Sequence, residues 1–253
     1  MTLHSEQYPA VKQRLGDVSS ILQDMAITTF DVDPKKMQDI LPADFTPEIV
    51  TLQNGTDRAL ISAVTFFNHN FFVGFAPFFK IQCHQTNYRA YVRYQGKQVA
   101  WFFGTSLGTK WNVVPRHIWK MPWHYANHTH QASWSAKHCT KYEWFATGKH
   151  GLEHLKTEGT NESIGILDGF SSEEDTWRTL THPFDGYLRR TDGKNVHYSV
   201  FHEPLHMERG KCIKAQFTLF EELGLIESDQ VPHSILLQQS IHYLISLPPK
   251  RYM

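Results

Sequence analysis

The stretch HQTNYRAYVRYQGKQVAWFFGTSL, residues 84–107, decides the predicted fold. Two runs rich in β-branched and aromatic residues flank the dipeptide Gln95-Gly96, a pattern typical of two strands joined by a tight turn. Side chains alternate between the two faces of a strand, so Gln85, Asn87 and Arg89 share one face. We therefore expect a β-hairpin that carries a polar stripe.

Similar runs recur along the chain and predict further strands. They are RALISAVTFF (58–67), IQCHQTNYRAYVRY (81–94), QVAWFFGTSL (98–107), NHTHQASW (127–134), HCTKYEWFAT (138–147), ESIGILDGF (162–170) and NVHYSVFH (195–202). The segments SWSAKHCT (133–140) and RRTDGKNV (189–196) predict two more hairpins. Successive hairpins favour an α+β, mainly antiparallel β fold: a closed or partly closed β-barrel or double sheet, with a few peripheral helices. Because no linker or repeat divides the sequence, we expect one domain over residues 1–253.

Four segments are candidate helices. The first lies near residues 11–25, and the second is DPKKMQDILP (33–42), where Asp33 can cap the helix and Pro34 suits its first turn. Ser171 and Glu174 have the spacing of a capping box ahead of EDTWRTL. The apolar spacing of IKAQFTLFEELG (213–224) predicts a helix that ends at Gly224.

Composition excludes several classes of protein. The 253 residues include 25 basic and 25 acidic side chains, so the chain lacks the excess positive charge of nucleic-acid or anionic-membrane binders. Its three cysteines are far apart and form neither a zinc motif nor a disulfide framework. The amino terminus has no apolar signal sequence, and polar residues interrupt the most apolar run, so we expect a cytoplasmic protein.

Four segments resemble, in order, the motifs of an uncharacterised bacterial family sometimes called YqjF-like. They are DVDPKKMQDILPADF (31–45), residues 84–107, PRHIWKMPWHYA (115–126) and GYLRRTDGKNVHYSVFHEPLHM (186–207). That family is grouped with acetoacetate decarboxylase and its relatives, which share a β-barrel around an enclosed cavity. The resemblance implies the same acetoacetate decarboxylase-like fold and a cavity that binds a small molecule, an organic acid or a keto acid.

The decarboxylase chemistry itself is not implied. Acetoacetate decarboxylase carries an adjacent lysine pair just after the proline of the third motif, and one lysine forms a Schiff base with the substrate. Here Pro122 is followed by Trp123 and His124, neither of which can form an iminium with a ketone. Gln85 stands where the family has a glutamate, and an amide cannot exchange protons at neutral pH. A Schiff-base lysine relocated to Lys120 is the alternative to a solvated lysine there.

These considerations give a set of candidate site residues. Arg89 and Arg116 are candidates to bind a carboxylate, because a guanidinium can grip it with two hydrogen bonds. Gln85, Asn87 and Trp123 are candidates to contact the ligand, and His124 and His202 are candidate catalytic residues because imidazole titrates near neutral pH. The alternatives are a structural arginine at 89 and a core histidine at 202 that bonds a carbonyl. No cofactor is expected, and the residues leave open whether any reaction is catalysed.

Two other classes of function stay open. Four histidines lie close in the sequence, and a His-x-His pair on one strand can ligate a metal; they are His124, His128, His130 and His138. No acidic residue lies between His117 and Lys141 to complete such a site. The third class is a structural or interaction protein whose apolar surface binds a partner or a second copy of the chain.

Overall fold

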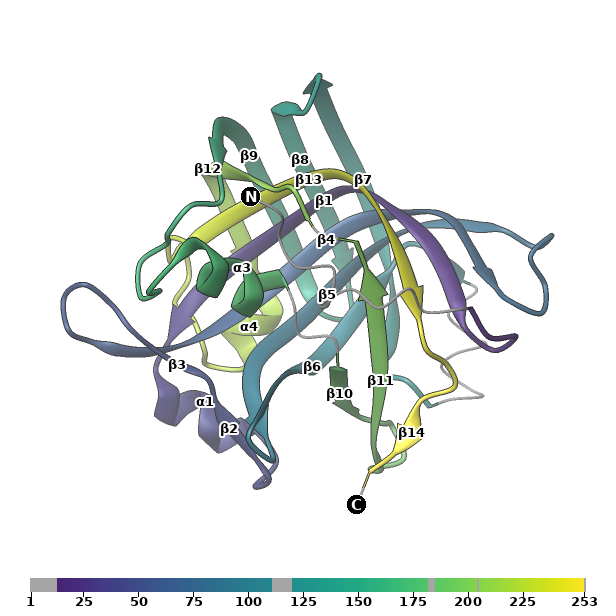
Figure 1. The fold of residues 1–253 in the computed structure, drawn as a ribbon, viewed down its shortest axis with the longest axis horizontal. Helices are drawn as coiled ribbons and strands as arrows, with labels where there is room; N and C mark the ends of the chain where they lie inside the picture. Colours follow the sequence, from purple (N-terminus) through teal and green to yellow (C-terminus); the bar gives the residue numbers. More distant parts are fainter. Residues whose placement is uncertain (1–12, 111–119, 182–184, 204, 253) are drawn as a thin grey trace.

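The computed structural model describes residues 13–110, 120–181, 185–203 and 205–252. One continuous sheet runs through these residues, and it curls into a ring (Figure 1). The main ring consists of β6 (Lys97–Leu107), β7 (Trp123–Ser135), β8 (His138–Gly148), β9 (Gly151–Ser163), β12 (Glu208–Phe217), β13 (Ser234–Ile245), β1 (Val18–Val32), β4 (Asp57–Val73) and β5 (Ile81–Tyr94). Strand β5 pairs with β6, which closes the ring.

Two strands divide the sheet and form a second, smaller ring. Strand β10 (Asp185–Arg189) pairs in parallel with β6, and β11 (Asn195–His202) pairs with both β10 and β13. The side ring therefore consists of β6, β10, β11, β13, β1, β4 and β5. The strands that the two rings share have the interior of one ring on each face. We call these two ring interiors the chambers. Short strands β2 (Phe45–Pro47), β3 (Ile49–Thr51) and β14 (Lys250–Arg251) extend the sheet edges.

The mainly antiparallel β-barrel fold is confirmed, and so is the hairpin of residues 84–107. Tyr94 pairs with Lys97, and the turn residues Gln95 and Gly96 have φ angles of 50° and 77°. Positive φ at both central positions is the geometry that suits a two-residue hairpin. The other two predicted hairpins join β7 to β8 and β10 to β11. The parallel pairs β6–β7 and β6–β10 were not predicted.

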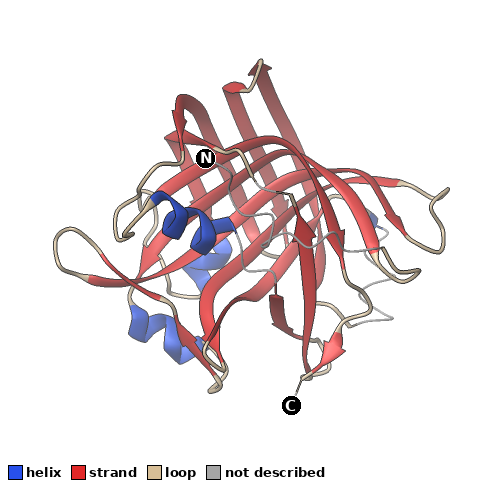
Figure 2. Ribbon diagram, viewed as in Figure 1, coloured by secondary structure: helices blue, strands red, loops and turns tan. Residues whose placement is uncertain are grey.

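The described residues form helices α1 (Pro34–Ile40), α3 (Glu173–Thr181) and α4 (Thr218–Glu222), which lie on the left in Figure 2. The Asp33 side chain accepts a hydrogen bond from Lys35 N, as the predicted cap requires. For α3 the cap is Ser172, whose Oγ accepts from Asp175 N at 3.0 Å, one residue later than predicted. None of these helices is long and apolar enough to cross a membrane.

Three predictions of secondary structure were wrong. Residues 18–25 belong to strand β1, and a bulge near Asp24 shifts its alternation so that the apolar spacing imitates a helix. Residues 213–217 belong to strand β12, so only the second half of the predicted helix exists. Residues 164–170 lie outside any strand, since β9 ends at Ser163. In each case tertiary pairing overrides a local pattern.

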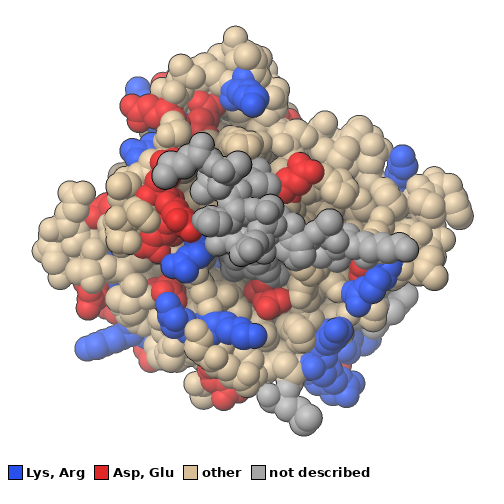
Figure 3. All heavy atoms as spheres, viewed as in Figure 1, with Lys and Arg blue, Asp and Glu red and all other residues tan. Residues whose placement is uncertain are grey.

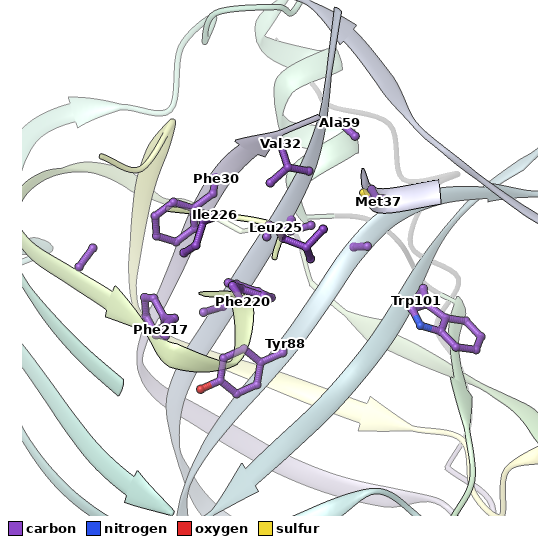
Figure 4. Close-up of a cluster of buried hydrophobic side chains, with 14 of the residues drawn as sticks. Phe30, Val32, Met37, Ala59, Tyr88, Trp101, Phe217, Phe220, Leu225 and Ile226 are labelled. Carbon is purple, nitrogen blue, oxygen red and sulfur yellow. The ribbon is translucent and has the colours of Figure 1, made fainter. Parts of the chain in front are cut away.

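Three buried clusters fill most of the two chambers, and two of the three are large. The larger one lies in the main ring, where Phe30, Phe217 and Phe220 pack with Tyr88 (Figure 4). Phe30 meets the other two phenylalanine rings edge-on, with centroids 6.2 Å apart, and such pairs stabilise a core beyond the burial of their area. The second cluster lies between β1, β4, β13 and α3 and includes Tyr91 and Leu180. Next to this second cluster, part of the interior of the side ring is not filled by side chains.

Candidate functional site

A cavity of about 90 Å³ lies inside the side ring, and we call it the side cavity. Most of its wall is apolar, and its polar side chains gather on β5 and β11. The described residues that line it are Leu22, Met25, Val64, Phe66, Asn68, Phe71, Gln85, Asn87, Arg89, Phe102, Met121, Trp123, Thr181, Gly186, Tyr198, Val200, His202, Tyr243, Ile245 and Leu247. An apolar cavity with a few converging polar groups is the usual form of a small-molecule site.

A chain of hydrogen-bonded side chains crosses one wall of the side cavity. Ser20 Oγ donates to Asn68 Oδ1, and Asn68 Nδ2 donates to Gln85 Oε1, both at 2.9 Å. Gln85 Nε2 then donates to Asn87 Oδ1 at 2.9 Å, and Thr105 Oγ1 donates to the same oxygen at 3.0 Å. With its oxygen occupied, Asn87 has its amide nitrogen left, and this nitrogen donates to no other described residue. This series of hydrogen bonds thus orients the side-chain NH₂ group of Asn87 at the cavity wall.

Arg89 lies two residues further along the same face of β5. Its Nη2 donates to Leu180 O at 2.7 Å and to Tyr91 Oη at 3.1 Å, so it binds the carboxyl end of α3. Its Nε is buried and has no hydrogen-bond partner in the part of the chain that the structure describes. The ion pairs of arginine within the described residues belong to other positions, so no described carboxylate neutralises Arg89. A half-buried guanidinium without a counter-ion attracts an anion.

Two tyrosines and a histidine face Arg89 across the side cavity. Burial raises the pKa of Tyr198 and of Tyr243, while the positive charge of Arg89 lowers it in part. Neither hydroxyl donates to another described residue. Burial also lowers the pKa of His202; the contacts with backbone carbonyls raise this pKa in part, and the charge of Arg89 lowers it further. Among the described residues of the wall, Arg89 is the one arginine, and none is a lysine.

Both ring nitrogens of His202 face backbone carbonyl oxygens. Its Nδ1 lies 2.7 Å from Glu203 O and its Nε2 lies 3.2 Å from Thr181 O, while its ring stacks on Tyr243 at 4.6 Å. Carbonyl oxygens only accept hydrogen bonds, so a neutral imidazole points its lone pair at one of them. This geometry orients His202 firmly and leaves no nitrogen aimed freely at a ligand.

The structure brings together most of the predicted site residues. Gln85, Asn87, Arg89, Trp123 and His202 all line the side cavity. Arg116 lies outside the described residues.

His124 and the nearest lysine lie elsewhere. His124 is adjacent to Trp123 on strand β7 and therefore points to the other face, where its ring packs 5.1 Å from that of His150. Lys120 is not among the described residues of the wall, and none of these is a lysine.

The four histidines proposed as metal ligands do not form one cluster. His128 and His130 lie with His84, whose ring centroid is 5.6 and 5.4 Å from theirs. His138 lies apart from them. In the described part of the chain, no group of three or more His, Cys, Asp or Glu side chains is arranged to hold a metal ion.

The acidic partners of these histidines come from distant strands. His130 Nε2 bonds Asp24 Oδ2 on β1, and His138 Nδ1 bonds Glu208 Oε2 on β12, both at 3.0 Å.

Sequence reasoning missed Asn68, Tyr198, Tyr243 and Thr181. A signal existed for Tyr198, because it shares the alternation of His202 on the predicted strand 195–202. Asn68 looked like an interruption of an apolar run. Tyr243 and Thr181 carry no local signal, since only the pairing of β11 with β13 and the docking of α3 bring them to the cavity.

Solved structures share this fold. The enduracididine biosynthesis enzyme MppR, complexed with the condensation product of pyruvate and imidazole 4-carboxaldehyde, has a TM-score of 0.61 and 10% identity over 95% of this chain and 90% of that chain. Acetoacetate decarboxylase from Legionella pneumophila has a TM-score of 0.58 and 12% identity over 100% and 98%. An acetoacetate decarboxylase-like enzyme from Sphingomonas wittichii RW1 has a TM-score of 0.61 and 11% identity over the full length of both chains. At these identities the likeness shows the fold alone.

No curated protein matches the chain by sequence. A family model described as an uncharacterized conserved protein matches residues 20–242, which is most of the chain. The fold is therefore acetoacetate decarboxylase-like, and the chain belongs to the DUF2071 family of uncharacterized conserved proteins.

Proposed function

We propose that this protein binds a small organic acid in the side cavity, with the carboxylate held by Arg89 and Asn87. The observation that carries the proposal is the Arg89 guanidinium: it lines the cavity, its Nε has no partner, and no described carboxylate pairs with it. The free amide nitrogen of Asn87 supplies a second donor on the same strand face. A carboxylate between them would satisfy both groups with charge-assisted hydrogen bonds.

The rest of the wall suggests which acids fit. Leu22, Met25, Phe66, Phe102 and Met121 surround the polar groups and favour a short apolar remainder. A volume of about 90 Å³ holds a molecule of a few carbon atoms. The hydroxyls of the two cavity tyrosines, Tyr198 and Tyr243, would donate to a further oxygen, such as that of a keto group. A solved structure of similar fold is a complex with pyruvate, which supports this class of ligand.

We propose that binding proceeds without a Schiff base, because the described wall of the cavity offers no lysine. Gln85 and Trp123 would then contact the ligand as neutral hydrogen-bonding and apolar groups. His202 is the one imidazole on the described wall, and it could transfer a proton only after giving up a backbone carbonyl. His124 lies on the other face of β7 and has no part in this proposal.

Isothermal titration with small keto acids, and with the amides of the same acids, tests the proposal. The acids should bind and the amides should not. Asn87→Asp keeps the oxygen that accepts from Gln85 and Thr105 and replaces the amide nitrogen with a charged oxygen. This substitution should weaken acid binding by at least about 100-fold, because the new carboxylate would repel the carboxylate of the ligand.

Asn127→Asp, an exposed change on β7, is the matched control and should leave affinity unchanged. Equal binding of acids and amides, or full affinity in Asn87→Asp, would contradict the proposal.

A further inference from the structure

The turn between β4 and β5 exposes an unusual amount of aromatic surface. Phe75, Phe78 and Phe79 are 68%, 87% and 49% exposed, and Leu15 beside them is 76% exposed. We call these four residues the aromatic tip. The β4–β5 hairpin projects at the right of Figure 1, and that end of the molecule is mostly uncharged on the face seen in Figure 3. Large apolar patches on a protein surface mark interaction sites.

Hydrogen bonds and close packing hold the aromatic tip in place. Gly74 N donates to Asp17 O at 2.8 Å, and Ala76 N and Phe79 N donate to carbonyls within the turn. A Cβ atom at Gly74 would lie 2.6 Å from Arg14 O, so glycine is needed for the hairpin to pack on the segment before β1. The aromatic rings therefore project from a braced turn.

The area of the aromatic tip is enough for a weak dimer. The three rings together expose about as much surface as two complete phenylalanine side chains, or roughly 400 Å². Leu15 adds to this area. Two copies meeting tip to tip would bury roughly 800 to 1,000 Å² in total, which is less than the roughly 1,200 Å² of a stable specific interface and within the range of weak, transient ones. The expected dimer is thus one of modest affinity.

Charge favours a second copy over a lipid surface. Residues 68–79 contain no Lys, Arg, Asp or Glu, and the net charge of the chain is zero. Among the described residues, two cations lie near the tip: Lys80, whose Nζ is 6.0 Å from the centre of the Phe72 ring, and Arg14, which pairs with Asp17 at 2.9 Å. An anionic bilayer would find little attraction here, whereas two copies would meet with little repulsion.

We propose that the aromatic tip is the contact surface of a symmetric homodimer, in which the tip of one copy packs on the tip of the other. A two-fold axis lets one patch serve both partners. Phe75 and Phe78 form the centre of the contact, because the most buried aromatic residues carry most of the energy of an interface. The proposal does not depend on what the side cavity binds.

Sedimentation equilibrium of the full chain tests the proposal. The unaltered protein should dimerise at micromolar concentration, and the double variant Phe75→Ser/Phe78→Ser should raise the dissociation constant at least about 30-fold. Val231→Ser removes a side chain that is 74% exposed at another place and should leave the dimer intact. Circular dichroism and thermal melting should show that both variants fold, since the substituted residues are exposed.

Two results would overturn the proposal. One is a chain that stays monomeric at about 100 μM, where even a weak specific dimer forms. The other is a double variant that dimerises as well as the unaltered protein. Co-sedimentation with phosphatidylcholine vesicles, with and without phosphatidylserine, identifies the competing occupant: a monomer that binds either kind of vesicle would assign the tip to lipid and refute the dimer.

Discussion

The substitution Arg89→Met separates a binding role of the guanidinium from a structural one. Methionine keeps much of the apolar stem but removes the charge and all donors. The bonds lost are those to Leu180 O at 2.7 Å and Tyr91 Oη at 3.1 Å. Neither partner is left bare, because Tyr91 Oη also donates to Leu180 O at 3.1 Å and bonds Ser62 Oγ at 2.8 Å.

The two expected effects differ in size. Losing two hydrogen bonds from a charged donor costs about 3 kcal/mol, and removing a buried N–H that has no partner returns about 1 to 2 kcal/mol. The net loss of about 1 to 2 kcal/mol lowers the melting temperature by only about 2–8 °C in a chain of this size. A carboxylate that loses its charge-assisted contact with a buried guanidinium loses about 3 to 4 kcal/mol, which is roughly 100-fold to 1,000-fold in affinity.

Three measurements on Arg89→Met separate these effects. Urea unfolding gives the loss of stability, calorimetric titration with the acids gives the loss of affinity, and an NMR titration follows the pKa of His202. Because the charge of Arg89 lowers the pKa of His202, that pKa should rise in Arg89→Met. Arg58→Met, which breaks the ion pair with Asp31 away from the cavity, is the control and should leave binding intact. A variant that folds, shows the rise in the His202 pKa and still binds acids within threefold would refute the assigned role of Arg89.

Three further predictions concern the chemistry and the packing of the chambers. Borohydride reduction in the presence of acetoacetate should leave the protein mass unchanged, whereas an adduct mapped to Lys120 would show a relocated Schiff-base lysine. Gly104→Ala should cost about 1 to 3 kcal/mol in urea unfolding, because its Cβ would lie 2.8 Å from two ring atoms of His150; an unchanged midpoint would show that the ring moves freely. Burial lowers the pKa of His84 and His150 from 6.5 to about 4, so the unfolded chain binds more protons between these values. Stability should therefore be complete above pH 6.5 and fall as the pH drops toward 4, and a flat urea midpoint over this range in the unaltered protein would contradict this.

The part of the site that could be predicted is the part set by local alternation. A tight turn at Gln95-Gly96 sets the register of β5 against β6 as far as Arg89, where an irregularity shifts the pairing. The period of two along β5 itself places Gln85, Asn87 and Arg89 on one wall. The same rule separates His124 from Trp123, which the resemblance to a lysine pair did not reveal. The alternation along one strand therefore predicts the polar stripe, but the side chains opposite the stripe depend on how the sheet closes into rings.

Distant contacts explain what the sequence could not show. At Asp24 the backbone has a φ angle of 49° within a bulge, and its carboxylate reaches His130 and Trp134 more than one hundred residues later. Residues 117–141 contain several histidines but no acidic residue. The acidic partners of His130 and His138 lie on β1 and β12, far away in the sequence. The bulge also disguised the start of β1 as a helix.

The two faces of β5 show why one strand can belong to two sites. Gln85, Asn87 and Arg89 face the side cavity, while His84, Thr86 and Tyr88 face the interior of the main ring. An antiparallel strand with one solvated face would be polar on that face, yet both faces of β5 are polar and enclosed. Such a strand is costly unless each polar group finds a partner, and the hydrogen-bonded chain through Asn68 and the Thr86–Glu153 bond supply them. Among the groups that β5 turns to the side cavity, the Arg89 Nε and the Asn87 amide nitrogen have no partner in the described residues, and these are the donors to which we assign the proposed anion.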